Sequence, residues 1–158
     1  MNKTIGIMLL LGMLSLSAWA APKQLSANDI SASNLKIVLG EEYGTSIDEE
    51  GTLVVQQGKS QKIVIAINQK EKLIIFWNAW IAKPSVSKEK CVQMTNDWIK
   101  DQSFFAVTYD ESNKRFIRCY AMSFQNGIIV ENLMVMLERY LSDDEKFVKY
   151  FYEAGVLK

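Results

Sequence analysis

Apolar residues recur at two spacings along this chain, and each spacing predicts one kind of element. Alternating or short apolar runs that are rich in β-branched and aromatic residues predict five strands, at residues 52–57, 62–68, 72–81, 104–109 and 115–124. Apolar residues three and four positions apart predict three helices, at residues 31–39, 85–102 and 129–154. Short connections favour antiparallel neighbours. The expected fold is therefore α+β, a five-stranded antiparallel sheet with three helices in the order α-βββ-α-ββ-α.

The last predicted helix is apolar on nearly all sides and also contains an acidic stretch. Val130, Val135 and Leu137 lie outside its main apolar stripe. Such a helix is buried on two sides, either by its own domain or by a second copy of the chain. Asp143 and Asp144 follow Ser142 near its middle, and they predict an exposed turn or a break in the helix.

The N-terminal residues have the pattern of a secretory signal peptide. Lys3 precedes an almost wholly apolar run at residues 5–16, and Ala18-Trp19-Ala20 has the small-x-small pattern of a cleavage site. A membrane-spanning helix needs about 20 apolar residues, so cleavage after Ala20 is favoured over an anchor. The expected organisation is a signal peptide at 1–20, a polar lead-in at 21–29 and an α+β domain at 30–158. The mature protein is expected to be periplasmic or secreted, without membrane insertion.

Composition excludes several classes of function. The chain has 158 residues, of which 49% are hydrophobic and 23% charged, a globular rather than a disordered composition. Its 18 basic and 18 acidic side chains give a formal net charge of zero, so no attraction to nucleic acid is expected. Histidine is absent, which excludes Ser-His-Asp and Cys-His catalytic pairs and histidine-bound metals. We expect no cofactor, and an enzyme would have to work with Asp, Glu, Lys or Tyr alone.

Cys91 and Cys119 are the only cysteines, and export permits a disulfide between them. Cys91 lies on the apolar stripe of the second predicted helix. The alternation in residues 115–124 groups Cys119 with Ile117 and Ala121, which are small enough to lie under that helix. A bridge would stabilise the fold by about 3 kcal/mol in the chain-entropy model. The alternative is two buried free thiols; a catalytic cysteine is not expected, because no histidine can activate it.

The turn Asp48-Glu49-Glu50-Gly51 gathers acidic side chains before a strand. Calcium loops distribute their ligands over about 12 positions and end on a bidentate Glu, which this turn lacks. We therefore expect a solvated turn and no metal site.

The run at 72–81 is apolar on both alternations, so one of its faces is a candidate binding surface. The face that contains the polar Asn78 is expected to point outward, as is the face of 115–124 that contains Arg118. Exposed aromatic patches mark partner surfaces. The predicted partner-binding set combines the side chains on these two faces: Phe76, Asn78, Trp80, Arg118, Tyr120 and Met122. The alternative is that the last helix or the chain end covers them.

Four motifs in a fixed order carry a family resemblance. They are the acidic turn 48–51, Asn96-x-Trp98 at the end of the second helix, the aromatic hairpin 104–124, and Asn126-Gly127-Ile128 leading to Glu131-Asn132-Leu133. In these motifs the chain resembles the YbjN-domain family, a group of bacterial proteins described as sensory transduction regulators, over about residues 30–155. The resemblance implies a fold similar to that of type III secretion chaperones, and it implies no catalytic residue. Ile99 and Ile129 depart from the family pattern, which often has Asn and a Ser or Thr cap there.

The sequence therefore predicts an exported, non-catalytic interaction protein, with a regulatory or chaperone-like role implied by the resemblance. Its expected partner is a protein or peptide, and homodimer formation is an open alternative. Two other functions remain as alternatives: a structural or stress protein of the cell envelope without a discrete ligand, and a histidine-independent enzyme.

Overall fold

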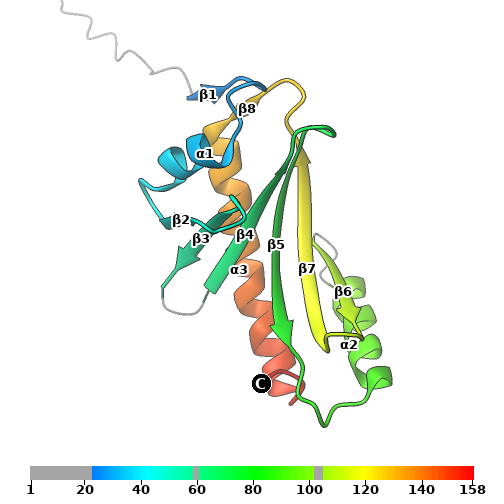
Figure 1. Ribbon diagram of the computed structural model, residues 1–158. Coiled ribbons are helices and arrows are strands. Elements are labelled where there is room, and N and C mark those ends of the chain that lie inside the picture. Colours follow the sequence, from blue (N-terminus) through cyan, green and yellow to red (C-terminus); the bar gives the residue numbers. More distant parts are fainter. Residues whose placement is uncertain (1–22, 59–60, 102–104) are drawn as a thin grey trace, which may run out of the picture.

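The computed structural model describes residues 23–58, 61–101 and 105–158, which form two layers (Figure 1). One layer is an antiparallel sheet and the other contains the three helices. The predicted signal peptide at 1–20, with its cleavage site after Ala20, lies outside the described residues.

The main sheet has six strands. Their order across the sheet is β2 (Gly44–Ile47), β3 (Leu53–Gln57), β4 (Gln61–Asn68), β5 (Leu73–Ile81), β7 (Arg115–Ser123) and β6 (Ala106–Asp110), and every neighbouring pair is antiparallel. The longest pairing, between β5 and β7, is registered from Leu73 opposite Ser123 to Ile81 opposite Arg115. The antiparallel α+β prediction is therefore confirmed.

The predicted number of five strands is wrong, because β2 adds a sixth strand at one edge. Its sequence, Gly-Thr-Ser-Ile, has no apolar alternation, and most of its residues are exposed. A strand that buries so little has no hydrophobic pattern to reveal it. A separate two-stranded ribbon, β1 (Gln24–Leu25) with β8 (Ile128–Ile129), also went unpredicted and lies partly within the 21–29 lead-in.

The three helices are α1 (Ala32–Leu39), α2 (Lys88–Asp101) and α3 (Val130–Glu153). The Ser31 hydroxyl accepts a hydrogen bond from the Asn34 amide, and the Ser87 hydroxyl accepts one from the Lys90 amide, so a serine caps the start of α1 and of α2. Helix α3 is continuous, and the predicted break near Asp143 and Asp144 is wrong. These two side chains have partners inside the fold and do not end the helix.

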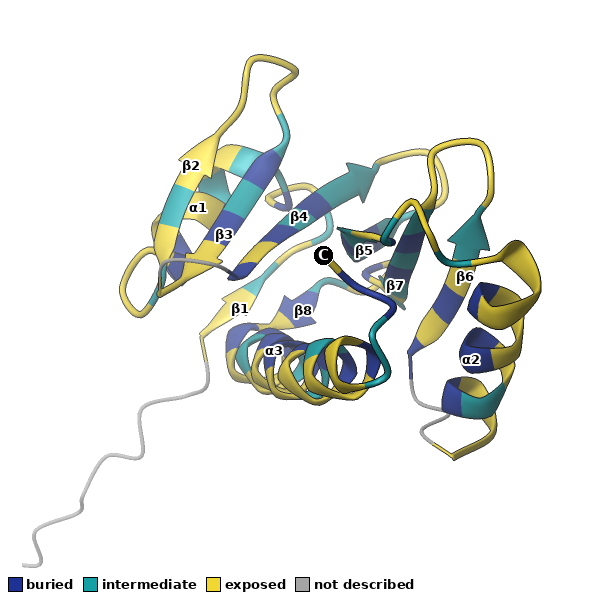
Figure 2. Cartoon of the chain, turned by 90° about the horizontal axis from the view of Figure 1, so that it is seen from below, coloured by how far each residue is buried: buried dark blue, intermediate teal, exposed yellow. Residues whose placement is uncertain are grey.

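All three helices pack on the same face of the sheet. Leu35 of α1 and Leu137 of α3 share one core cluster with Leu53 of β3. Cys91 of α2 and Phe151 of α3 share a second cluster with Phe116 of β7. The strand register places the strand residues of both clusters on one side of the sheet. Figure 2 shows α3 and α2 on the same side of β5 and β7.

Candidate functional site

The sheet face opposite the helices carries a row of uncharged and mostly apolar side chains across all six strands. Cross-strand pairing aligns its members, which are Ser46, Val54, Val64, Trp77, Cys119 and Ala106. Each is partly or fully exposed. We call this side of the sheet the open face, because in the described part of the chain no helix lies on it. An apolar sheet face without a covering layer is typical of a surface that contacts another molecule.

Trp77 is the largest side chain of that row, and its neighbours are small. Cys119 lies opposite it on β7 and Val64 opposite it on β4. The flanking outward positions include Ala66, Ala79 and Ala121. Ile75 is the larger neighbour on the same strand, and Trp77 lines a hollow on its β4 side.

The acidic turn between β2 and β3 borders Trp77. One Asp48 carboxylate oxygen accepts hydrogen bonds from the amides of Glu50, at 3.0 Å, and Thr52, at 2.8 Å. Gly51 has a φ of 80°, which favours glycine. The turn and the sheet enclose a hollow of about 600 Å³, lined by Asp48, Glu49, Glu50, Thr52, Val64, Ala66 and Trp77. The turn is solvated, as the sequence predicts, and it also forms one wall of a hollow on the open face.

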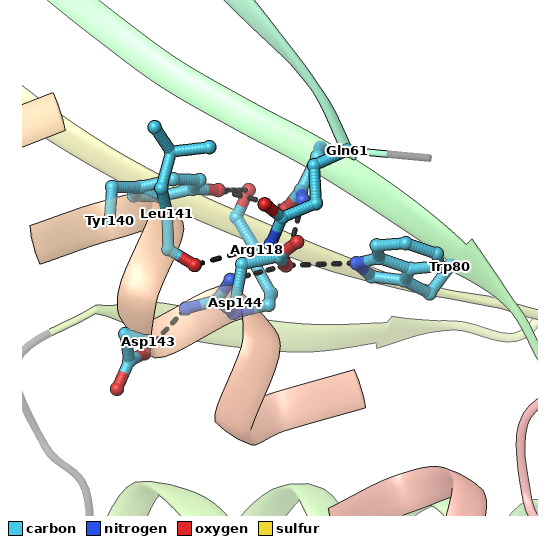
Figure 3. A network of polar contacts seen from close by, with 8 residues as sticks. Gln61, Trp80, Arg118, Tyr140, Leu141, Asp143 and Asp144 are labelled. Atoms are coloured by element: carbon cyan, nitrogen blue, oxygen red, sulfur yellow. Dashed lines mark hydrogen bonds and ion pairs between the residues drawn. The ribbon is translucent and has the colours of Figure 1, made fainter. Parts of the chain in front are cut away.

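A buried polar network lies on the helix side of the sheet (Figure 3). Arg118 of β7 donates to Asp144 and to Asp143 of α3, each at 2.5 Å. The same Asp144 oxygen also accepts from the Asn78 amide at 2.8 Å and from the Trp80 indole at 2.9 Å. Arg118 and Asp144 are completely buried. One carboxylate thus compensates three donors that the sheet directs toward the helix.

Tyr140 closes the network from α3. Its hydroxyl lies 2.8 Å from the Arg118 carbonyl oxygen and 3.0 Å from the Asn78 side-chain oxygen. The guanidinium of Arg118 lies 4.9 Å from the Tyr140 ring centroid and 5.1 Å from that of Phe147, so its faces meet aromatic rings. Burial raises the pKa of the Tyr140 hydroxyl well above its usual value, which keeps the hydroxyl protonated. The network joins α3 to the sheet, although the Arg118 Nε and the second Asp144 carboxylate oxygen are buried without a hydrogen-bond partner.

The predicted exposed aromatic patch is therefore wrong. Phe76, Asn78 and Arg118 are buried, and Trp80, Tyr120 and Met122 are only partly exposed on the same helix-covered side. The prediction took Asn78 and Arg118 as outward because they are polar. Their partners, Asp144 and Tyr140, lie on α3, far away in sequence, so no local pattern could show that these polar groups are satisfied inside.

The two cysteines are free thiols, and they lie on opposite sides of the sheet. Cys91 packs beside Phe116 in the core under α2, whereas Cys119 alternates with Arg118 and lies on the open face. The disulfide alternative placed the Cys119 side of β7 under the helix, which is the reverse of what the structure has. The other alternative was two buried free thiols. It is right that both thiols are free and that Cys91 is buried, but Cys119 is partly exposed.

Within residues 23–58, 61–101 and 105–158, no group of three Cys, Asp or Glu side chains is arranged to hold a metal ion. In the same ranges no helix is long and apolar enough to cross a membrane.

Sequence reasoning missed Trp77 as a surface residue. It assigned Trp77, Ile75 and Ala79 to the inward face of the run at 72–81, whereas the buried residues are Ile74, Phe76 and Asn78. The one signal in the sequence is size: the outward positions of β4, β5 and β7 include Ala66, Ala79 and Ala121, which are small for core positions.

Comparisons with known proteins agree with this architecture. A model of the YbjN family, described as "Putative bacterial sensory transduction regulator", matches residues 35–153. The structure is similar to that of YbjN from E. coli, described as "a putative transcription regulator", with a TM-score of 0.69 and 11% identity over 82% of this chain and 96% of that one. It is also similar to a chain of the ExsC–ExsE complex, with a TM-score of 0.53 and 13% identity over 77% of this chain and 96% of that one. At these identities the likeness concerns the fold. A search of curated proteins gives no match.

Proposed function

The chain belongs to the YbjN family, and from that membership we propose that it is an exported, non-catalytic regulator that holds a protein or peptide partner on the open face. The observation that carries this proposal is the row centred on Trp77. It runs across all six strands and stays partly exposed, while the helices cover the opposite side. Water contact with such an apolar row is unfavourable, and a partner would remove it.

Two further observations support a protein partner. The row contains no charged side chain, as is common at the centre of protein interfaces. A chain of similar fold is found in the ExsC–ExsE complex, so this fold is compatible with binding another protein. The chaperone-like role that the sequence resemblance implied fits the same surface.

The absence of catalysis is part of the proposal and follows from the character of the polar groups. In the buried network the carboxylates and the guanidinium already bind each other, and Arg118 and Asp144 are fully buried. In the hollow beside Trp77 the carboxylates stand on an exposed turn, next to Val64 and Ala66, with no cysteine, serine, lysine or tyrosine among the lining residues. Neither arrangement pairs a nucleophile with a base.

Photocrosslinking tests the binding surface. A photoreactive amino acid replaces Ala121, which is exposed on the open face, and in a matched variant it replaces Glu138, which is exposed on α3. We expect a discrete crosslinked protein from position 121 in the envelope fraction of the producing bacterium, and none from position 138. The proposal fails if position 121 gives no product or if both positions give the same ones.

Export is tested separately by the mass of the protein recovered from that fraction. Cleavage after Ala20 predicts a chain that begins at Ala21. Recovery of the uncleaved chain from the cytoplasm would contradict export without affecting the binding surface.

A further inference from the structure

The hollow beside Trp77 combines two features that have no partner within the described residues. The Trp77 ring forms no stacking or cation–π contact there, and the side chains of Glu49 and Glu50 form no ion pair. Asp48 differs, because one of its oxygens already accepts two amide hydrogen bonds. An accessible indole and unpaired carboxylates thus line the same hollow.

Resting on the proposed function, we propose that the open face binds an extended segment of a partner protein that places a lysine or arginine side chain in this hollow. The occupant follows from charge complementarity. Glu49 and Glu50 attract a cation, and Trp is the best aromatic partner for one. The apolar stem of Lys or Arg packs against Val64 and Ala66, which line the same hollow.

The geometry favours a peptide segment over a small free cation. The hollow of about 600 Å³ continues into the apolar row, in which Trp77 is flanked by Val64 and Cys119. A segment that follows this row buries apolar side chains beside its basic one, which a free cation cannot do. A bare metal ion fits less well, because no metal-binding group of three ligands exists among the described residues.

Short synthetic peptides test the inference. They are acetylated and amidated, alternate Thr and Val, and differ only in a central Arg, Lys, Gln or Glu. Binding to the full mature chain is followed by calorimetry and by the indole N–H resonance of Trp77, which the Trp77→Phe variant assigns. We expect the Arg and Lys peptides to bind and to shift this resonance, with affinity falling as salt is raised. The Gln and Glu peptides should bind more weakly.

Variants separate the two features. The double variant Glu49→Gln, Glu50→Gln should lower the affinity for the Arg peptide by about 3- to 10-fold. Trp77→Leu should lower it by a similar factor. Glu71→Gln, an exposed acidic residue on the β4–β5 turn, is the matched control and should leave the affinity unchanged. Both changed sites are on the surface, and chemical unfolding of each variant verifies that it folds.

Three outcomes would overturn the inference. If the Arg and Gln peptides bind equally well through Trp77, the hollow does not recognise a basic side chain. The proposed binding of a protein on the open face would be unaffected by that result. A Trp77 shift that depends on protein concentration alone would assign the open face to a second copy. If no peptide binds but position 121 still crosslinks to a partner, this inference fails and the proposed function stands; if both fail, the open face binds no protein.

Discussion

Arg118 is the largest fully buried side chain within the described ranges, and its guanidinium pairs with two neighbouring aspartates of α3. Removing one partner of a buried ion pair leaves the other charge without compensation. Arg118→Met should therefore lower the free energy of unfolding by about 3–5 kcal/mol, measured by urea denaturation.

The matched control is Arg115→Met. Arg115 pairs with Asp110 at 2.9 Å, but its side chain is 39% exposed, so solvent screens the pair. Its loss should cost at most about 1 kcal/mol. Equal losses for both variants would show that the network around Arg118 contributes no more than a surface ion pair.

Tyr140 makes stability sensitive to alkaline pH. Burial raises its pKa above the usual value of 10.0, so the folded chain keeps a proton that the unfolded chain loses. The stabilisation is complete below about pH 10 and decreases as the pH rises further, by up to about 1.4 kcal/mol per pH unit. Urea unfolding between pH 8 and pH 11 should show this decrease.

Tyr140→Phe should flatten that pH dependence, at a cost of about 1 kcal/mol at neutral pH for the lost hydrogen bonds. Some slope remains, since burial also raises the pKa values of Tyr43 and Tyr109. Tyr152→Phe, at a residue 62% exposed, is the control and should keep the full slope. The assignment to Tyr140 fails if the two variants behave alike.

At the scale of elements, hydrophobic pattern was enough to find the strands that bury a face. Ile63 and Ile65 alternate with more exposed neighbours, so β4 is visible in the sequence. The sequence does not show which face of β5 is buried, because the residues on both of its faces are mostly apolar. The polar Asn78 then led to the wrong choice of outward face. Its hydrogen-bond partner Asp144 lies on a helix that is distant in the sequence.

The candidate site was missed for the same reason. The prediction reversed the two faces of β5 and β7. It therefore placed the residues of the buried network on the surface and Trp77 in the core. The acidic turn was recognised from its residues, but its position beside Trp77 depends on the pairing of Val64 with Trp77, which is a tertiary feature. Local pattern thus predicts elements and turns, whereas the choice of face requires the packing of distant segments.

The β1–β8 ribbon depends on a glycine that the fold cannot easily replace. Gly127 has a φ of 80°, and a Cβ at this position would overlap the Leu25 carbonyl oxygen. Gly127→Ala should therefore cost more than the about 1–2 kcal/mol of a left-handed alanine, and amide exchange in the ribbon should accelerate.

Gly51→Ala is the matched control, because Gly51 has the same φ of 80° and a Cβ added there would meet nothing within 4 Å. It should show only the backbone cost. Similar losses for the two variants would mean that the ribbon shifts enough to accommodate the added Cβ.

At the scale of the whole molecule, the sheet separates a covered side from an uncovered one, and one cysteine lies on each. Cys91 is buried among Phe116 and Trp98, and burial raises the pKa of its thiol, which slows its reaction. Cys119 is partly exposed next to Trp77. Iodoacetamide should therefore modify Cys119 first and Cys91 only after unfolding, as read by peptide mass.

The same reaction reports whether the open face is occupied. A segment bound along the row covers Cys119 but cannot touch Cys91, which lies on the other side of the sheet. Saturation with the Arg peptide should slow alkylation of Cys119 several-fold, and the rate of Cys91 in partly denatured protein serves as the internal reference. Slowing of both thiols together would point to general stabilisation of the fold, whereas unchanged reactivity of Cys119 would place the partner elsewhere.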